Sequence, residues 1–400
     1  MGRSIGFFIV PPLFTLAALG LLHCKGAPSS PGSGGKGGQD GVASNVGKGG
    51  QGGVGATGGD TTSTSGTGGG STGSGGFNAG NEGGEGPGGG GAGDIDAGLD
   101  AGDIDAGGSP PCVELKGQVQ QLAKGVYCVT GDVIIPAGTT LSIPPGTELV
   151  FMNRHHFGRD PALPDAVGIV SGGLSAIGTA AEPIVFRGKT PQTGWFGITI
   201  SYSPVPVHLE HVTIRDTYKD DHDPSSRIWR RGGGLSSYVN EKGTIIRHGK
   251  FINNRAWMVA GALDINGNGI WPNNGPVEIS DTLFEGNSCE CGVYVGSADD
   301  KCGGGAIRFS HVGGPVTIVN NVFHDNHALA TSGIDAYGGA IGAFDSALPL
   351  GSGNLFDGNV AQKADGAISC AGHPQLGVNF ISVAANNTFT GNLPDIGCGL

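Results

Sequence analysis

A short pattern, Phe-x-x-Asn, occurs five times between residues 251 and 392, and no other feature of this chain constrains its fold as strongly. Successive Phe residues are 33, 39, 33 and 33 positions apart. A Gly-Gly-Ala-like run ending in Leu or Ile accompanies each copy. A glycine-rich composition does not place Phe and Asn at a regular spacing, so we interpret the pattern as an internal repeat. The Phe-x-x-Asn copies begin at Phe251, Phe284, Phe323, Phe356 and Phe389, and the companion runs are GGGL at 232–235, AGAL at 260–263, GGAI at 304–307, GGAI at 338–341 and DGAI at 365–368.

A repeat near 33 residues without helical periodicity predicts a parallel β-solenoid. The apolar runs, such as Val316-Thr-Ile-Val319, are short, rich in β-branched residues and bounded by Gly, Asn, Asp or Pro. We expect the repeated Phe residues to stack inward from coil to coil. We expect the Asn to adopt the left-handed turn conformation and to bond the neighbouring backbone. The Gly-Ala pair suits a crowded corner, where a larger side chain would meet the next coil.

These motifs resemble the repeats of the polymorphic outer-membrane proteins, which are defined by GGA[ILV] and FxxN. The resemblance covers about residues 230–395. It implies a right-handed, single-stranded parallel β-helix of the pectate-lyase-like superfamily that acts at the cell surface, often as an adhesin. Residues 131–217 resemble the opening coils of secreted β-helix proteins, in which a first apolar segment caps the helix. We therefore expect one β-helix domain over residues 112–400, large enough for a continuous core.

Residues 1–24 read as an export signal that ends at a lipidated cysteine. Arg3 precedes a mainly apolar stretch over residues 5–22, and Cys24 follows where a bacterial lipoprotein signal places its acylated cysteine. His23 departs from the small residue usual before that cysteine. The alternative is an ordinary secretory signal with an incidental Cys24.

Residues 25–111 have the composition of a disordered tether. Positions 26–111 contain 35 glycines and a single aromatic residue, Phe77. Such a segment buries too little surface to offset its ordering entropy. As a flexible coil it would span roughly 50 Å. We therefore expect an outer-membrane lipoprotein or cell-surface protein, with the membrane contacted through the lipid anchor only; the alternative is a secreted protein.

Charge and cysteine usage agree with export. The formal net charge of −12 argues against a nucleic-acid partner. We expect disulfides rather than a zinc site, because the cysteines lack a fourth nearby ligand and a His at the usual spacing. Cys112 and Cys128 flank the expected cap strand, and Cys370 and Cys398 lie about one coil apart. Cys302 pairs with either Cys289 or Cys291, and the sequence leaves that choice open.

The N-T-D, G-H-G and R-I-K signatures of β-helix hydrolases are absent from the sequence. Only the stretch YKDDHDPSSRIWRR at 218–231 contains enough acidic, basic and aromatic residues close together to form a catalytic or binding site. Three carboxylates there are candidate acids, bases or calcium ligands, three arginines are candidate contacts for a uronate, and a tryptophan is a candidate sugar platform. The alternative, which we expect, is a solvated loop whose opposite charges pair. The candidates are Asp220, Asp221, Asp223, Arg227, Trp229, Arg230 and Arg231.

Two functions of different class follow from these observations. The first is a surface-tethered β-helix that binds or adheres to glycans or other envelope components, with no catalysis and no cofactor. The second is an extracellular polysaccharide lyase or glycoside hydrolase with its site on residues 218–231. The missing hydrolase signatures and the repeat resemblance favour the first.

The lipid anchor is directly testable. We expect Cys24→Ser to release the protein from membranes without unfolding residues 112–400, because a Gly-rich tether makes no structural contacts. Membrane fractionation combined with incorporation of a labelled fatty acid measures this. A wild-type protein that takes up no label would contradict lipidation.

Overall fold

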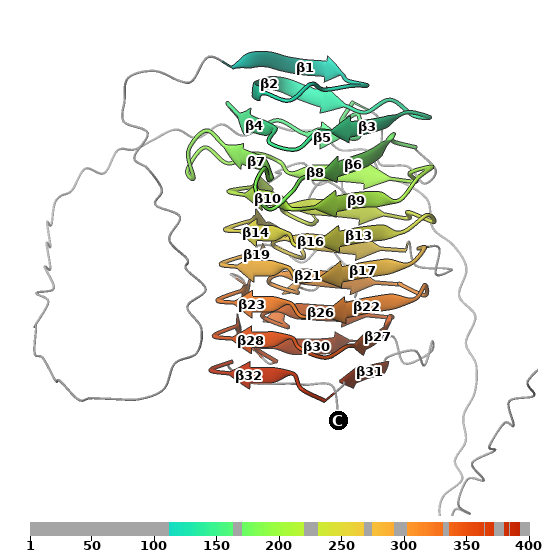
Figure 1. Cartoon of the computed structure of the whole chain (residues 1–400). Helices are drawn as coiled ribbons and strands as arrows, with labels where there is room; N and C mark the ends of the chain where they lie inside the picture. Colours follow the sequence, from blue (N-terminus) through green and yellow to red (C-terminus); the bar gives the residue numbers. More distant parts are fainter. Residues whose placement is uncertain are drawn as a thin grey trace, which may run out of the picture. The chain divides into compact units, whose positions relative to one another are not determined.

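The chain forms a parallel β-helix in which coils of short strands stack along one axis (Figure 1). The computed structural model describes residues 112–162, 170–219, 231–267, 274–291, 302–330, 336–363, 365–371, 380–383 and 385–392, all within one compact unit, Gly98–Leu400. None of these residues is helical. The predicted right-handed single-stranded β-helix is therefore confirmed, while the predictions for residues 1–111 lie outside the described residues.

Two long sheets run the length of the stack and are joined at its N-terminal end. We call one the GGA sheet, because most of its strands follow the Gly-Gly-Ala-like runs, and the other the Phe sheet, because it carries the Phe-x-x-Asn residues. β1 (Val113–Gln118) pairs with the nine-residue β2 (Val126–Ile134), which then pairs with both sheets. The GGA sheet contains β5 (Phe157–Gly158), β8 (Ile198–Ser201), β12 (Leu235–Tyr238), β16 (Leu263–Asn266), β21 (Ile307–Ser310), β26 (Ile341–Phe344) and β30 (Ile368–Ala371). The Phe sheet contains β4 (Glu148–Phe151), β7 (Ile184–Gly188), β10 (Val212–Arg215), β14 (Lys250–Ile252), β18 (Leu283–Glu285), β23 (Val322–His324), β28 (Leu355–Asp357) and β32 (Thr388–Thr390).

A third long sheet closes the coil, and two smaller sheets lie where the chain leaves the Phe sheet and returns to the GGA sheet. The third sheet contains β3 (Thr140–Ile143), β6 (Gly173–Ile177), β9 (Val207–Glu210), β13 (Thr244–Arg247), β17 (Val277–Ser280), β22 (Val316–Val319), β27 (Ala347–Leu350) and β31 (Phe380–Val383). The short sheet contains β11 (Tyr218–Lys219), β15 (Arg255–Ala256), β19 (Ser288–Cys291), β24 (His327–Ala330) and β29 (Val360–Ala361), and β20 (Cys302–Gly303) pairs with β25 (Ala336–Tyr337).

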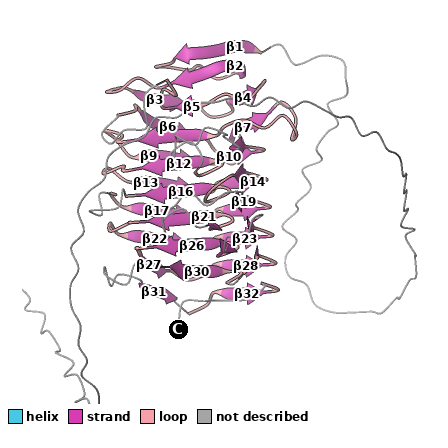
Figure 2. Ribbon diagram, turned by 180° about the vertical axis from the view of Figure 1, so that it is seen from behind, coloured by secondary structure: helices cyan, strands magenta, loops and turns pink. Residues whose placement is uncertain are grey.

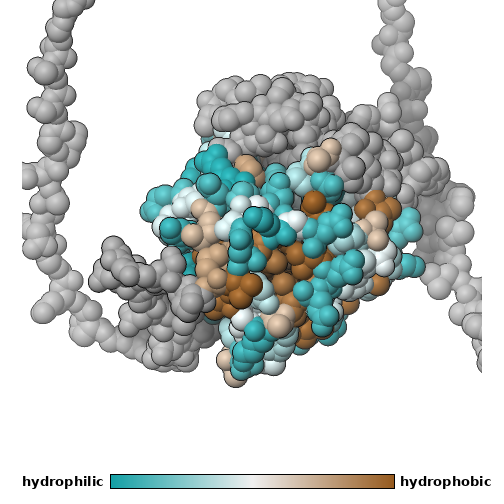
Figure 3. Space-filling model, turned by 90° about the horizontal axis from the view of Figure 1, so that it is seen from above, coloured by the Kyte–Doolittle hydropathy of each residue, from teal (hydrophilic) through white to brown (hydrophobic). Residues whose placement is uncertain are grey.

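Equivalent strands of successive coils pair in parallel, and they keep one register except for a shift between Leu115 and Gly117 in the pairing of β1 with β2. In the GGA sheet, for example, Leu235 pairs with Leu263, and Leu263 pairs with Ile307. Inward residues of the three long sheets form one hydrophobic core, which runs from Leu115 to Ile368. Figure 3, which views the N-terminal end, shows apolar residues gathered in the middle and polar residues around them. The cluster from Leu115 to Ile368 is the continuous core predicted for the domain.

The repeated Phe and Asn residues form two ladders along the helix, as predicted. The five Phe rings stack in nearly parallel pairs, with centroids 4.7–5.1 Å apart. The first four Asn side chains each donate from Nδ2 to the Oδ1 of the Asn in the next coil at 2.9–3.0 Å. The same Nδ2 also donates to a backbone oxygen of the preceding coil; Asn287, for example, bonds the Phe251 carbonyl at 2.9 Å. Amide ladders of this kind satisfy buried polar groups while joining coils.

The Asn residues themselves are not left-handed, so that part of the prediction is wrong. The left-handed residue is the one just before each Asn: Asn253, Gly286, Asp325, Gly358 and Gly391 have φ between 50° and 64°. One residue at positive φ turns the chain, and the following Asn then projects inward to bond its neighbours. The residue before each Asn therefore forms the turn, and the Asn itself forms the ladder.

The Gly-Gly-Ala runs occupy a crowded corner, as predicted. A Cβ placed on Gly305 would lie 2.1 Å from the Gly339 carbonyl oxygen, and one on Gly339 would lie 2.3 Å from that of Gly366. Distances this short are not tolerated by real side chains, and the obstacle is backbone that does not move aside. The position before this glycine is left-handed, for example Gly338 with φ of 65°. The motif therefore combines a turn residue with a glycine required by the neighbouring coil.

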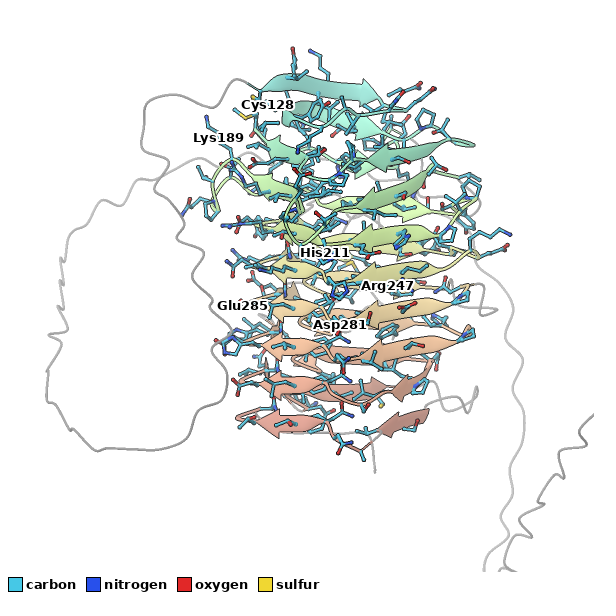
Figure 4. All side chains as sticks on the ribbon, in the orientation of Figure 1. Cys128, Lys189, His211, Arg247, Asp281 and Glu285 are labelled. Carbon is cyan, nitrogen blue, oxygen red and sulfur yellow. A yellow bond between two sulfur atoms is a disulfide. The ribbon has the colours of Figure 1, made fainter. Side chains whose placement is uncertain are left out.

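One of the expected disulfides is confirmed. Cys112 and Cys128 form a disulfide, with Cα atoms 5.4 Å apart, that links the start of β1 to β2; Figure 4 shows Cys128 at this end. Cys370 is also disulfide-bonded. Its expected partner, Cys398, lies outside the described residues.

The Phe ladder yields a stability prediction. Phe323 is fully buried between Phe284 and Phe356, so Phe323→Ala should lower the free energy of unfolding by about 3–5 kcal/mol. Val322→Ala, on the outer side of the same strand, is the control and should cost far less. Urea denaturation compares the two, and equal losses would contradict a stacked interior ladder.

Candidate functional site

The GGA sheet is buried on both faces, unlike the other two long sheets. All four residues of β16, β21 and β26 are buried, whereas strands of the third sheet alternate between buried and partly exposed residues. Figure 2, seen from behind, shows β12, β16, β21, β26 and β30 one below another. Some other part of the chain therefore covers the outer face of this sheet, and the residues enclosed there are polar.

We call the outward residues that directly follow the Gly-Gly-Ala-like corner the polar row. They are hydrogen-bonded neighbours on successive strands, so their Cα atoms lie about 4.8 Å apart in sequence order. Because the β-helix keeps one register, a side chain at this position always meets the equivalent side chain of the next coil. In order along the helix the row is Thr199, Ser236, Asp264, Arg308, Gly342 and Ser369.

Lys219 extends into the polar row from the short sheet. Its Nζ donates to Thr199 Oγ1 at 3.2 Å and to the backbone oxygen of Arg231 at 3.0 Å. The side chain is fully buried. Burial lowers the pKa of Lys219 to about 7, because desolvation disfavours the ammonium more than the charge of Asp264 favours it. Lys219 therefore changes its protonation state near neutral pH.

Asp264 lies in the middle of the polar row and is also fully buried. Neither of its carboxylate oxygens has a hydrogen-bond partner among the described residues, and the same is true of the neighbouring Ser236 hydroxyl. Burial raises the pKa of the Asp264 carboxyl, although Arg231, Arg308 and Lys219 each favour its charged form. Buried oxygens without partners are rare in folded proteins, so these three require an explanation.

Neighbouring residues extend the site in two directions. On one side His156 is held neutral: burial, and then the charge of Lys219, lower its pKa to about 3. On the other side Arg308 contacts the Phe344 ring with its guanidinium carbon 5.5 Å from the centroid, and its Nε donates to Ser310 Oγ. Arg308 and Phe344 also line a small cavity of about 20 Å³, which is room for about one water molecule. The other lining residues are Cys302, Gly303, Tyr337, Gly342, Ala343 and Ser369.

The charges elsewhere on the helix behave differently. Arg247 and Glu278 form a two-bonded ion pair on the outer face of the third sheet, and Arg255 pairs in the same way with Glu290 on the short sheet. These side chains are between a quarter and a half exposed, so such pairs contribute little to stability. Figure 4 shows Arg247 and Glu285 on the outside of two different sheets. The described residues that are charged and buried include Lys219, Asp264 and Arg308 at the polar row, and Arg159 and Asp216 outside it.

The sequence hypothesis located this site only in part. Asp220, Asp221, Asp223, Arg227, Trp229 and Arg230 lie outside the described residues. Arg231 is described and only 7% exposed, and it joins the cluster through its backbone contact with Lys219 and its charge effect on Asp264. Lys219 and Arg231, close to the two ends of the charged stretch, are therefore buried.

Lys219 and Asp264 were missed, although the repeat contains a signal for each. Lys219 occupies the strand position of Ala256, which pairs with Cys289 one coil later, so a long cation stands where small side chains are usual. Asp264 is likewise a charged residue directly after the motif run AGAL. Comparing residues at equal phase of the repeat would have found both.

No family model, curated protein or solved structure matches this chain. The described residues contain no helix long and apolar enough to cross a membrane. In the same residues there is no cluster of three or more His, Cys, Asp or Glu side chains arranged to hold a metal ion. The polar row offers carboxylate, hydroxyl, ammonium and guanidinium groups.

The buried Lys219 makes stability depend on pH. Between its folded pKa of about 7 and its ordinary value of 10.5, the unfolded chain binds more protons, so the free energy of unfolding rises with pH. The slope for one proton is about 1.4 kcal/mol per pH unit. Lys219→Met should remove this rise, whereas Lys250→Met, at an exposed position, should retain it. Urea denaturation at pH 7.5 and 9.5 tests this, and equal pH dependence in both variants would contradict a lowered pKa for the buried Lys219 amine.

Proposed function

We propose that this protein is an exported β-helix, held to the cell envelope by a lipid on Cys24, that binds polysaccharide at the polar row without catalysing its cleavage. The observation that carries the proposal is the group of buried oxygens without hydrogen-bond partners at Asp264 and Ser236. The export signal, the Gly-rich tether and the resemblance of the repeats to those of surface proteins support the location.

The unpaired oxygens suit a ligand rich in hydroxyl groups. A carboxylate accepts hydrogen bonds on both oxygens, and a serine hydroxyl accepts and donates, so Asp264 and Ser236 together offer the contacts that adjacent sugar hydroxyls make. A metal ion suits this position less well, because Lys219, Arg231 and Arg308 are all close enough to shift the pKa of Asp264. Those cations also favour a saccharide that carries carboxylates.

The direction of the polar row also suits a polymer. The row extends along the helix axis over six coils, the direction in which an elongated saccharide chain would lie. In the coil after Asp264, Arg308 adds a cation beside the Phe344 ring. Because Asp264 is fully buried, binding requires local movement, and we expect slow association.

A specific observation favours a second function, a polysaccharide-cleaving enzyme. Burial lowers the pKa of Lys219 to about 7, so this amine can accept and release a proton near neutral pH, and burial raises the pKa of Asp264, which favours its protonated form. In such an enzyme Lys219 would act as general base and Asp264 as general acid. We rank this second because the hydrolase signatures are absent from the sequence.

Binding and cleavage are separated by one experiment on the full chain. A glycan array should show that the wild type binds carboxylated polysaccharide, and that Asp264→Asn weakens binding about tenfold or more, because ligand hydroxyls lose a charged acceptor. Glu285→Gln, on the Phe sheet, is the control and should bind as the wild type does. Thermal unfolding confirms that each variant is folded.

The same samples are assayed for new chain ends in the bound polysaccharide. The proposal predicts none. Cleavage by the wild type that disappears in Lys219→Met would establish the enzyme instead, and an Asp264→Asn variant that binds normally would remove the polar row from the site.

A further inference from the structure

A second, small apolar cluster lies outside the main core and contains two cysteines. Cys289 on β19 and Cys302 on β20 are fully buried there among Ala328, Ala330, Ala336 and Ala361. Their sulfur atoms are 2.9 Å apart. All the other members are alanines, so the two sulfurs are the only reactive atoms of this cluster.

Strand pairing holds both cysteines in place. Cys289 pairs with Ala256 in one neighbouring coil and with Ala328 in the other, and Cys302 pairs with Ala336. A disulfide requires sulfurs about 2.0 Å apart, so closing the bond needs a movement of about 1 Å. Rotation of the two side chains supplies a movement of this size without changing the register of either strand.

We infer that Cys289 and Cys302 form a disulfide in the exported protein. This pairing selects Cys289, rather than Cys291, as the partner of Cys302. The inference depends on an oxidising compartment and on the geometry of the small cluster, but not on saccharide binding.

The bond forms by thiol–disulfide exchange with an external disulfide, such as that of a thiol oxidoreductase. The thiolate of one cysteine attacks that disulfide, forms a mixed disulfide and releases one external thiol. The second cysteine then attacks the mixed disulfide and releases the other thiol. The protein loses two hydrogens, and the external disulfide is reduced to two thiols. Because both sulfurs are buried in the folded coil, the exchange precedes final packing of β20.

The disulfide would also fix one wall of the small cavity beside Arg308. Cys302 and Gly303 both line that cavity. A Cβ on Gly342 would lie 2.7 Å from the Gly304 nitrogen and 3.0 Å from the Gly303 carbonyl carbon, so the chain at β20 packs directly on the GGA sheet. Joining β20 to β19 therefore restrains the layer that covers the outer face.

Peptide mapping without reduction tests the pairing. The full chain is purified from membranes, unfolded in the presence of N-ethylmaleimide so that every free thiol is blocked, and then digested with trypsin and a glutamate-specific protease. Cleavage after Glu290, Lys301 and Arg308 places the three cysteines on separate peptides: 286–290, 291–301 and 302–308. We expect a linked pair of 286–290 with 302–308, and a maleimide adduct on 291–301. A link between 291–301 and 302–308, or an adduct on all three peptides, would overturn the inference.

Three further samples separate geometry from export. Protein that has been reduced and then reoxidised with oxidised glutathione should regain the same link, whatever the compartment of origin. Cys291→Ser should keep the link, and Cys289→Ser should lose it and leave Cys302 alkylated. Loss of the link in Cys291→Ser would show that Cys291 is the true partner.

Discussion

The hydrogen bonds between successive coils are the interaction on which the rest of this structure depends. Every long strand pairs in register with its equivalents, and the inward Asn residues repeat the same bonding with their side chains. A coil alone cannot bury its apolar face, so it is stable only when stacked on its neighbours. The stacking also dictates which residues meet, because any given phase of the repeat forms a line along the helix. The stacking of coils therefore both stabilises the helix and determines which side chains lie next to one another along it.

The polar row is the line of residues along the helix that does not follow this pattern of stabilising contacts between coils. A parallel sheet buried on both faces is normally apolar, yet the outer face of the GGA sheet carries Asp264 and Arg308 and receives Lys219. Burying these groups opposes folding unless they pair fully, and Asp264 lacks hydrogen-bond partners among the described residues. Local conflicts of this kind are expected where a protein keeps residues for function. The outer pairs such as Arg247 and Glu278 show no comparable conflict.

The sequence predicted the fold well, because period and phase are local properties that a single chain reveals. The spacing of Phe251, Phe284 and their successors implied a stack, and the glycines implied a corner crowded by the next coil. The position of the left-handed residue was missed because Asn and the residue before it are both permitted at positive φ. Lys219 and Asp264 were missed for another reason. Their burial depends on how the smaller sheets cover the GGA sheet, and residue type alone does not indicate that arrangement.

Hydrogen–deuterium exchange of the full chain, with and without a carboxylated polysaccharide, tests the central claim most directly. Exchange reports opening of backbone hydrogen bonds element by element, so it locates a ligand without a variant. The account predicts that the polysaccharide slows exchange in β12 and β16, which carry Ser236 and Asp264, and leaves the Phe sheet unchanged. Slower exchange confined to the third sheet or the Phe sheet would contradict this account. A polysaccharide that binds the chain without slowing exchange anywhere would contradict it as well.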